Sequence, residues 1–109
     1  MIKSNCYGYA LYKLGLQEKD EQPKFLFSSE WFWQTFERVA KMKDADAVAW
    51  LSDSGYPYHM AIVDKRKDRL SHRYGFGARV QRVSAKFAGI SYDGMDRAFL
   101  KLKKQAPIA

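Results

Sequence analysis

The spacing of apolar positions along the chain changes near Asp46. Before this residue, apolar side chains recur every three or four positions, as on one face of a helix. After it, they form short runs or alternate with polar residues, between segments rich in Gly, Pro, Asp and Ser, as in β-strands. The pattern predicts an α+β domain in which N-terminal helices pack on an antiparallel β-sheet of about four or five strands.

Two helices are predicted in the first half of the chain. The first, over residues 4–15, begins with Ser4 as its N-cap and ends at Gly15, and its apolar stripe starts at Tyr7. The second covers roughly residues 30–43, after a serine cap at position 28 or 29.

Strands joined by short turns are predicted for the second half of the chain. The predicted strands lie at residues 46–52, 58–63, 70–74, 79–83 and 98–104, with a helix as the alternative for the last of these. The charged segment 64–69 predicts the tip of a hairpin. The whole chain, residues 1–109, is predicted to form a single domain.

Composition restricts the class of protein. A hydrophobic content of 47% excludes a disordered chain. The single cysteine excludes an internal disulfide and a four-thiolate zinc site. The N-terminus lacks the apolar run of a signal peptide, and no stretch is apolar enough to span a bilayer. We therefore expect a cytoplasmic protein from the chain as given, while a phage-encoded or exported protein remains an alternative.

The net charge of +7 comes mainly from bases in the second half. Such a surface attracts polyanions, including nucleic acid, anionic lipid and anionic cell-wall polymers. A charged surface that only keeps the protein in solution is at least as good an interpretation. Nucleic acid is thus a candidate partner that the charge alone does not favour.

The candidate chemistry lies in one cysteine and two histidines. Cys6 falls in the first turn of the predicted helix, where unpaired backbone N–H groups favour the thiolate and lower its pKa below the free value of about 8.5. The alternative is a buried structural thiol. His59 and His72 lie on either side of the charged tip. If Val63 pairs with Asp68, the histidines face each other, whereas a register shifted by two residues places them diagonally on the same face.

A cysteine at a helix start, a strand histidine and a second polar residue behind it are the parts of a thiol hydrolase. In this interpretation Cys6 is the nucleophile, and we expect Cys6, His59 and His72 to lie in that order in one open cleft. The alternative is a Cys–His–His zinc site, which lacks the close ligand spacing of known zinc motifs. The sequence therefore predicts neither a metal nor a cofactor.

Three segments in order resemble the NlpC-like family of papain-like cysteine hydrolases, best known as cell-wall endopeptidases. They are NCYGYAL (5–11), DAVAWL (46–51), and HMAIV followed by a charged turn and LSHR. The resemblance implies a papain-like fold and a cysteine peptidase or amidase in which Cys6 is the nucleophile, His59 the general base and acid, and His72 the orienting residue. It also implies a thioester acyl-enzyme and an oxyanion hole that includes the Cys6 backbone N–H.

The resemblance leaves the substrate open. A peptide or amide bond, in peptidoglycan or in another anionic substrate, fits it, and so does a papain-like amidase of phage or toxin origin. Asn5 stands where the family usually has an acidic residue, and Tyr7 or Tyr9 would have to replace the family's upstream tyrosine. The alternatives are a non-enzymatic basic domain that binds nucleic acid or another polyanion, and an inactive papain-like interaction module.

Overall fold

The computed structural model describes residues 2–25, 27–64, 66, 68–84, 86, 92 and 94–103. Its elements are α1 (Cys6–Lys13), α2 (Ser29–Thr35), β1 (Phe36–Val39), the short 3-10 helix η1 (Met42–Asp44), β2 (Ala47–Leu51), β3 (Pro57–Asp64), β4 (Arg69–His72), β5 (Gln81–Ser84) and β6 (Asp96–Leu102). Lys65 and Lys67 of the predicted hairpin tip, and Lys104 at the end of the predicted last strand, lie outside the described residues.

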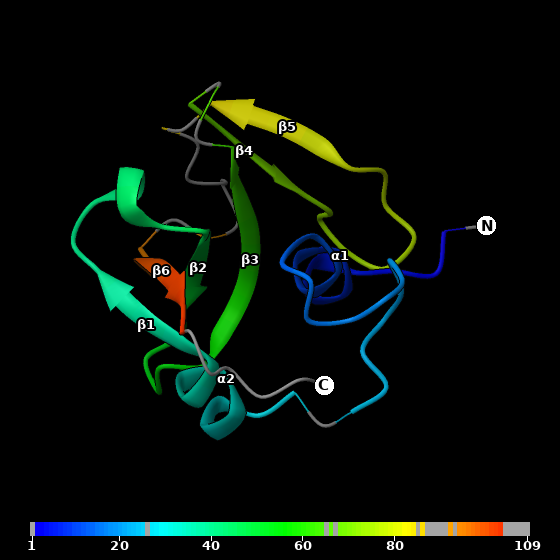
Figure 1. Cartoon of the computed structure of the whole chain (residues 1–109), viewed down its shortest axis with the longest axis horizontal. Coiled ribbons are helices and arrows are strands. Elements are labelled where there is room, and N and C mark those ends of the chain that lie inside the picture. The colour runs from blue at the N-terminus through cyan, green and yellow to red at the C-terminus, as the bar shows by residue number, and fades with distance from the viewer. Residues whose placement is uncertain are drawn as a thin grey trace.

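The fold is α+β, as predicted. All strand pairs are antiparallel, and the strands follow the order β1-β6-β2-β3-β4-β5 in one sheet. Six strands are described, so the estimate of four or five was too low. The sheet curves around α1, which lies beside β3 and below β4 and β5, whereas α2 lies near β1 at the other end of the sheet (Figure 1).

The additional strand comes from the second predicted helix, which is shorter than expected. After a cap at Ser28, α2 ends at Thr35, and the next four residues form β1 instead of continuing to position 43. Phe36 pairs with Leu102, so this segment forms sheet hydrogen bonds with β6. Pairing with a distant strand therefore overrides the helical spacing of the local sequence.

Helix α1 begins one residue later than predicted and ends as predicted. Its N-cap is Asn5, not Ser4, because the Asn5 Oδ1 accepts a hydrogen bond of 2.8 Å from the Gly8 N–H. Gly15 follows the helix at φ +77°, a left-handed conformation that suits glycine. The N–H of Leu16 then donates to the carbonyl of Leu11, which completes a Schellman ending.

Buried apolar side chains fill both faces of the sheet. The helical face carries Ala10, Leu11, Leu16, Phe32, Phe36, Ala47, Ala49, Leu51, Met60, Ala98 and Leu100. The opposite face carries Ala45, Val48, Trp50, Ala61, Val63, Leu70 and Tyr92. The central strands are therefore covered on both sides, and α1 is held against the face that includes Met60.

We predict that Gly8→Ala destabilises the protein although alanine favours helices. A Cβ at this position would collide with the backbone of Glu21 and lie 2.7 Å from the Ser4 Oγ. Overpacking of this kind costs about 1–3 kcal/mol, and denaturant unfolding measures it. Gly75→Ala is the matched control, because a Cβ there meets nothing within 4 Å. A Gly8→Ala protein as stable as the parent would contradict the described packing.

Candidate active site

The register of the β3–β4 hairpin differs from the predicted one by two residues. Val63 pairs with Leu70, not with Asp68. Asp68 has φ +51° and belongs to the turn, so pairing starts at the following residue. Because a shift of two residues leaves every side chain on its original face, His59 and His72 still lie on the same face of the sheet.

The two histidines form a buried hydrogen-bonded pair. The His59 Nε2 lies 2.7 Å from the His72 Nδ1, and the ring planes are 78° apart. His59 is 1% exposed and His72 is 0% exposed. The bond fixes the orientation of the His59 ring and occupies its Nε2, which makes Nδ1 the nitrogen that can exchange a proton with a thiol.

Aromatic rings surround this histidine pair. Tyr92 stacks on His59 with the ring centroids 4.6 Å apart and the planes 14° apart. The indole of Trp50 lies 5.4 Å from the His59 ring, and Tyr74 lies 4.7 Å from the His72 ring. Burial among these rings, and secondarily the proximity of His72, lowers the pKa of His59 to about 3. Burial also lowers the pKa of His72.

The Cys6 thiol lies at the first turn of α1, next to the backbone of β3. Strand β4 pairs with β3 only from Ile62 onward, and the start of α1 approaches β3 at Met60. The backbone of Met60, Tyr7 and Cys6 itself favours the ionised form and lowers the pKa of the thiol. The thiol therefore lies beside the residue that follows His59, among three backbone donors.

The predicted lowering of the Cys6 pKa is wrong. Cys6 is only 6% exposed, and burial raises the pKa of its thiol to about 11 although the backbone N–H groups oppose the shift. The helix start supplies the expected donors, but desolvation outweighs them. The resting site consequently holds a neutral thiol and a neutral imidazole.

The structure brings together only part of the predicted triad. Within the described part of the chain, His59 bonds to His72, but no hydrogen bond joins the Cys6 thiol to either ring. The predicted open cleft is also wrong, because all three side chains are buried. Tyr92, stacked on His59, and Tyr74, packed against His72, contribute to the burial of the two histidines.

The two tyrosines suggested as oxyanion donors bond elsewhere. The Tyr7 hydroxyl donates to the carbonyls of Pro57 and Tyr58, at 2.5 and 3.0 Å. The Tyr9 hydroxyl donates to the Ser71 Oγ at 3.0 Å. These three bonds attach α1 to the sheet, so the two hydroxyls have a positioning role.

The aromatic residues that surround the histidines were not predicted from the sequence. Trp50 directly precedes Leu51 in β2 and pairs with His59, while Tyr74 and Tyr92 come from later segments. Side chains of paired residues lie on the same face of a sheet, so the pairing of Trp50 with His59 places both side chains on one face. The register that pairs them is known only from the structure. No local pattern places Tyr92 over the same ring.

Among the residues that the structure describes, no three His, Cys, Asp or Glu side chains are arranged to hold a metal ion. In the same residues, no helix has the length and apolar character needed to cross a membrane.

Comparison of the chain with protein-family models, curated proteins and solved structures finds no match. The assignment of function consequently depends on the geometry described above and on the chemistry of its residues.

We predict that the protein loses stability as the pH falls from about 6.5 towards 3. The pKa of His59 is about 3 in the folded protein and 6.5 without the fold, so below pH 6.5 the unfolded chain binds the proton that the folded protein excludes. Each buried histidine then contributes up to about 1.4 kcal/mol of lost stability per pH unit. Denaturant unfolding between pH 7.5 and 5 measures the slope.

The His59→Gln variant serves as the control for this slope. It should lose roughly half of the pH dependence, because His72 is also buried with a lowered pKa. Carboxylates such as Asp20 and Asp96, whose pKa values are lowered, titrate below this window and contribute little to it. A stability that stays constant from pH 7.5 to 5 would show that the histidines are not buried as neutral rings.

Proposed function

We propose that the chain is a cysteine hydrolase that cleaves an amide or peptide bond, with Cys6, His59 and His72 as its catalytic set. The observation that carries the proposal is the buried 2.7 Å hydrogen bond between the histidines, on a strand where the backbone of the next residue, Met60, lowers the pKa of the Cys6 thiol. An orienting partner for a histidine, on a strand whose adjacent backbone meets a cysteine at a helix start, supports the assignment of a catalytic triad.

The hydrogen bond specifies the tautomers that the proposal needs. For the His59 Nδ1 to accept a proton, its Nε2 must carry hydrogen and donate it to the His72 Nδ1. The single hydrogen of neutral His72 then lies on its own Nε2. Both rings remain neutral at physiological pH because their pKa values are lowered, so His59 is in the form that acts as a base.

In the proposed reaction, the Cys6 sulfur attacks the carbonyl carbon while its proton moves to the His59 Nδ1. The imidazolium that forms donates a stronger hydrogen bond to His72 and then protonates the leaving amine, which leaves a thioester on Cys6. Water attacks the thioester with His59 again as base, and the acid is released with the free thiol. Atoms and protons balance without a cofactor.

The start of α1 supplies donors for the developing oxyanion. Asn5 accepts the Gly8 N–H, whereas the N–H groups of Cys6 and Tyr7, at the first two helical positions, interact with the sulfur. These two groups precede the first residue that can bond within the helix, so they are available to an oxyanion next to the thiol.

Because the Cys6 thiol and the His59 imidazole are both neutral at rest, their pKa values determine at which step the thiol proton is transferred. With a thiol pKa of about 11 and an imidazole pKa of about 3, a preformed ion pair is unfavourable. Proton transfer is therefore coupled to attack on the substrate, whose carbonyl adds polarity to the site. Catalytic hydrogen bonds commonly become short only when substrate is bound, which is consistent with the missing contact between thiol and ring.

The resemblance to the NlpC-like family supports the same assignment. It gives the three residues the same roles, and its papain-like fold also places a cysteine helix against an antiparallel sheet. We accordingly propose a peptide or amide substrate of the kind found in peptidoglycan.

Acylation of Cys6 by p-nitrophenyl acetate tests the proposal. The wild-type protein should release a burst of p-nitrophenolate and show an acetyl group on Cys6 by mass spectrometry. His59→Gln should slow the reaction by about 100-fold or more, because a general base typically contributes 10²–10⁴-fold. His72→Gln should slow it less and displace the pH–rate profile, since His72 only orients His59.

Tyr12→Phe, an exposed change in the same helix, is the matched control and should react like the wild type. If Cys6→Ala retains the burst, or if His59→Gln reacts as fast as the parent while remaining folded, the hydrolase proposal is wrong.

A further inference from the structure

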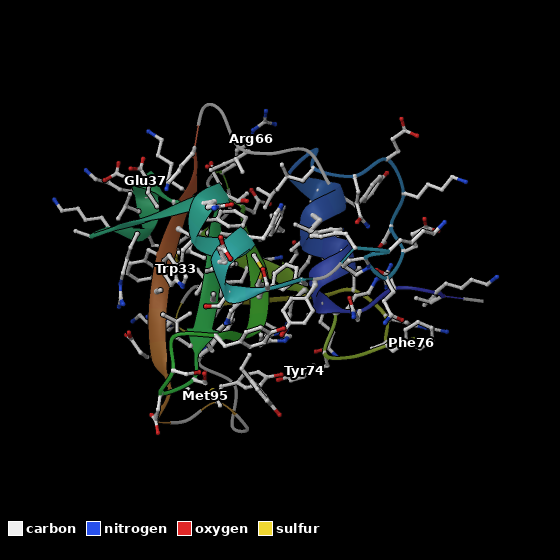
Figure 2. The ribbon with its side chains drawn as sticks, turned by 90° about the horizontal axis from the view of Figure 1, so that it is seen from below. Trp33, Glu37, Arg66, Tyr74, Phe76 and Met95 are labelled. Atoms are coloured by element: carbon white, nitrogen blue, oxygen red, sulfur yellow. The ribbon has the colours of Figure 1, made fainter. Side chains whose placement is uncertain are left out.

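A second site lies at the other end of α1 from Cys6. A cavity of about 470 Å³ is lined by residues of α1, the β3–β4 hairpin and β5. Lys13, which lines it, follows Cys6 by seven residues, a rise of about 10 Å along the helix. In Figure 2, Arg66 of this cavity lies at one edge of the molecule and Tyr74, which packs on the histidines, lies towards the opposite edge. The cavity is therefore distinct from the proposed active site.

Four cations from four segments line this cavity: Lys13, Arg66, Arg69 and Arg82. Ser71 pairs with Arg82, and Arg69 is two residues from Ser71 in β4, so both arginines share one face of the sheet. Ser71 bonds to Tyr9 of α1, which identifies this face as the helical one. Arg69 and Arg82 are thus diagonal neighbours on the helical face, and both side chains are exposed.

The local acids do not neutralise this charge. Among the described residues, the ion pairs use the cations Lys24, Arg38 and Arg73, and none of the four that line the cavity. Two acids, Asp46 and Asp64, also line it, and each accepts a backbone N–H, from Leu102 and Arg66 respectively. The lining therefore carries an excess of two positive charges.

The floor of the cavity adds a hydroxyl donor. Tyr9 is 6% exposed and Ser71 is 8% exposed, and the tyrosine donates the hydrogen of their mutual bond. Among the described residues, the Ser71 hydroxyl takes part in this bond alone, as its acceptor. Its own hydrogen can therefore be donated to a ligand. A hydroxyl donor in a cavity that arginines also line is suited to an oxyanion.

We propose that this cavity binds a small ligand with at least two negative charges on phosphate or carboxylate groups. Guanidinium groups bind both kinds of oxyanion through paired hydrogen bonds, and the volume is within the range of about 300–1,000 Å³ typical of small-molecule sites. All four cations line one cavity, which favours a compact anion over an extended nucleic acid. The inference is independent of the proposed hydrolase function.

Titration with tripolyphosphate and with citrate at low salt tests the site. Isothermal calorimetry should show saturable one-to-one binding of at least one of them, with NMR shifts at the amides of Ser71 and Arg82. Binding of tripolyphosphate alone identifies a phosphate site, and binding of citrate alone identifies a carboxylate site.

The double variant Arg69→Gln/Arg82→Gln should bind at least about tenfold more weakly, since each bidentate contact contributes strongly to affinity. The variant should melt within a few degrees of the parent without ligand, because both arginines are exposed. Arg79→Gln is the matched control: it is an exposed arginine that does not line the cavity, and its affinity should change less than about twofold.

Equal weakening in the double variant and in Arg79→Gln would show a general charge effect and overturn the proposal. Absence of binding of either anion at millimolar concentration would also overturn it. So would binding of a DNA oligonucleotide that depends on Arg69 and Arg82 while tripolyphosphate and citrate do not compete.

Discussion

The packing of α1 against β3 is the constraint on which the proposed site depends. Tyr7 donates to the carbonyls at the start of β3, and Leu11 packs on the helical face of the sheet, so the first turn of α1 is fixed at Met60. The close approach at Gly8 allows the loop that follows the helix to contact its surface. These contacts determine the position of the sulfur more directly than any interaction of the thiol itself.

The same packing determines the electrostatics of the site. Removing water raises the pKa of Cys6 and lowers that of His59, so both groups are driven to their neutral forms. A neutral imidazole with its Nε2 held by His72 is prepared to accept a proton. In the proposed reaction, the Cys6 proton therefore moves to His59 while the sulfur attacks the substrate. A helix start alone would instead suggest a stable thiolate–imidazolium ion pair.

Several features of the fold could be predicted from local sequence, for identifiable reasons. Gly15 ends α1 because a left-handed residue is needed there. His59 and His72 lie on one face, although the register differs from the prediction by two residues, because side chains alternate between faces with a period of two. Strand β1 could not be predicted, because its partner β6 lies far along the chain. The burial of Cys6 agrees with the structural-thiol alternative that the sequence left open. The burial of the histidines could not be predicted, since Tyr92 and Tyr74 reach them only through the tertiary fold.

The tautomer of His59 is the central claim that one measurement can test most directly. Long-range proton–nitrogen NMR correlation distinguishes protonated from unprotonated imidazole nitrogens. At neutral pH the account predicts hydrogen on the His59 Nε2 and none on its Nδ1, with an unprotonated His72 Nδ1 at the other end of the 2.7 Å bond. Hydrogen on the His59 Nδ1 would leave no nitrogen able to accept the thiol proton, and would contradict the proposed mechanism.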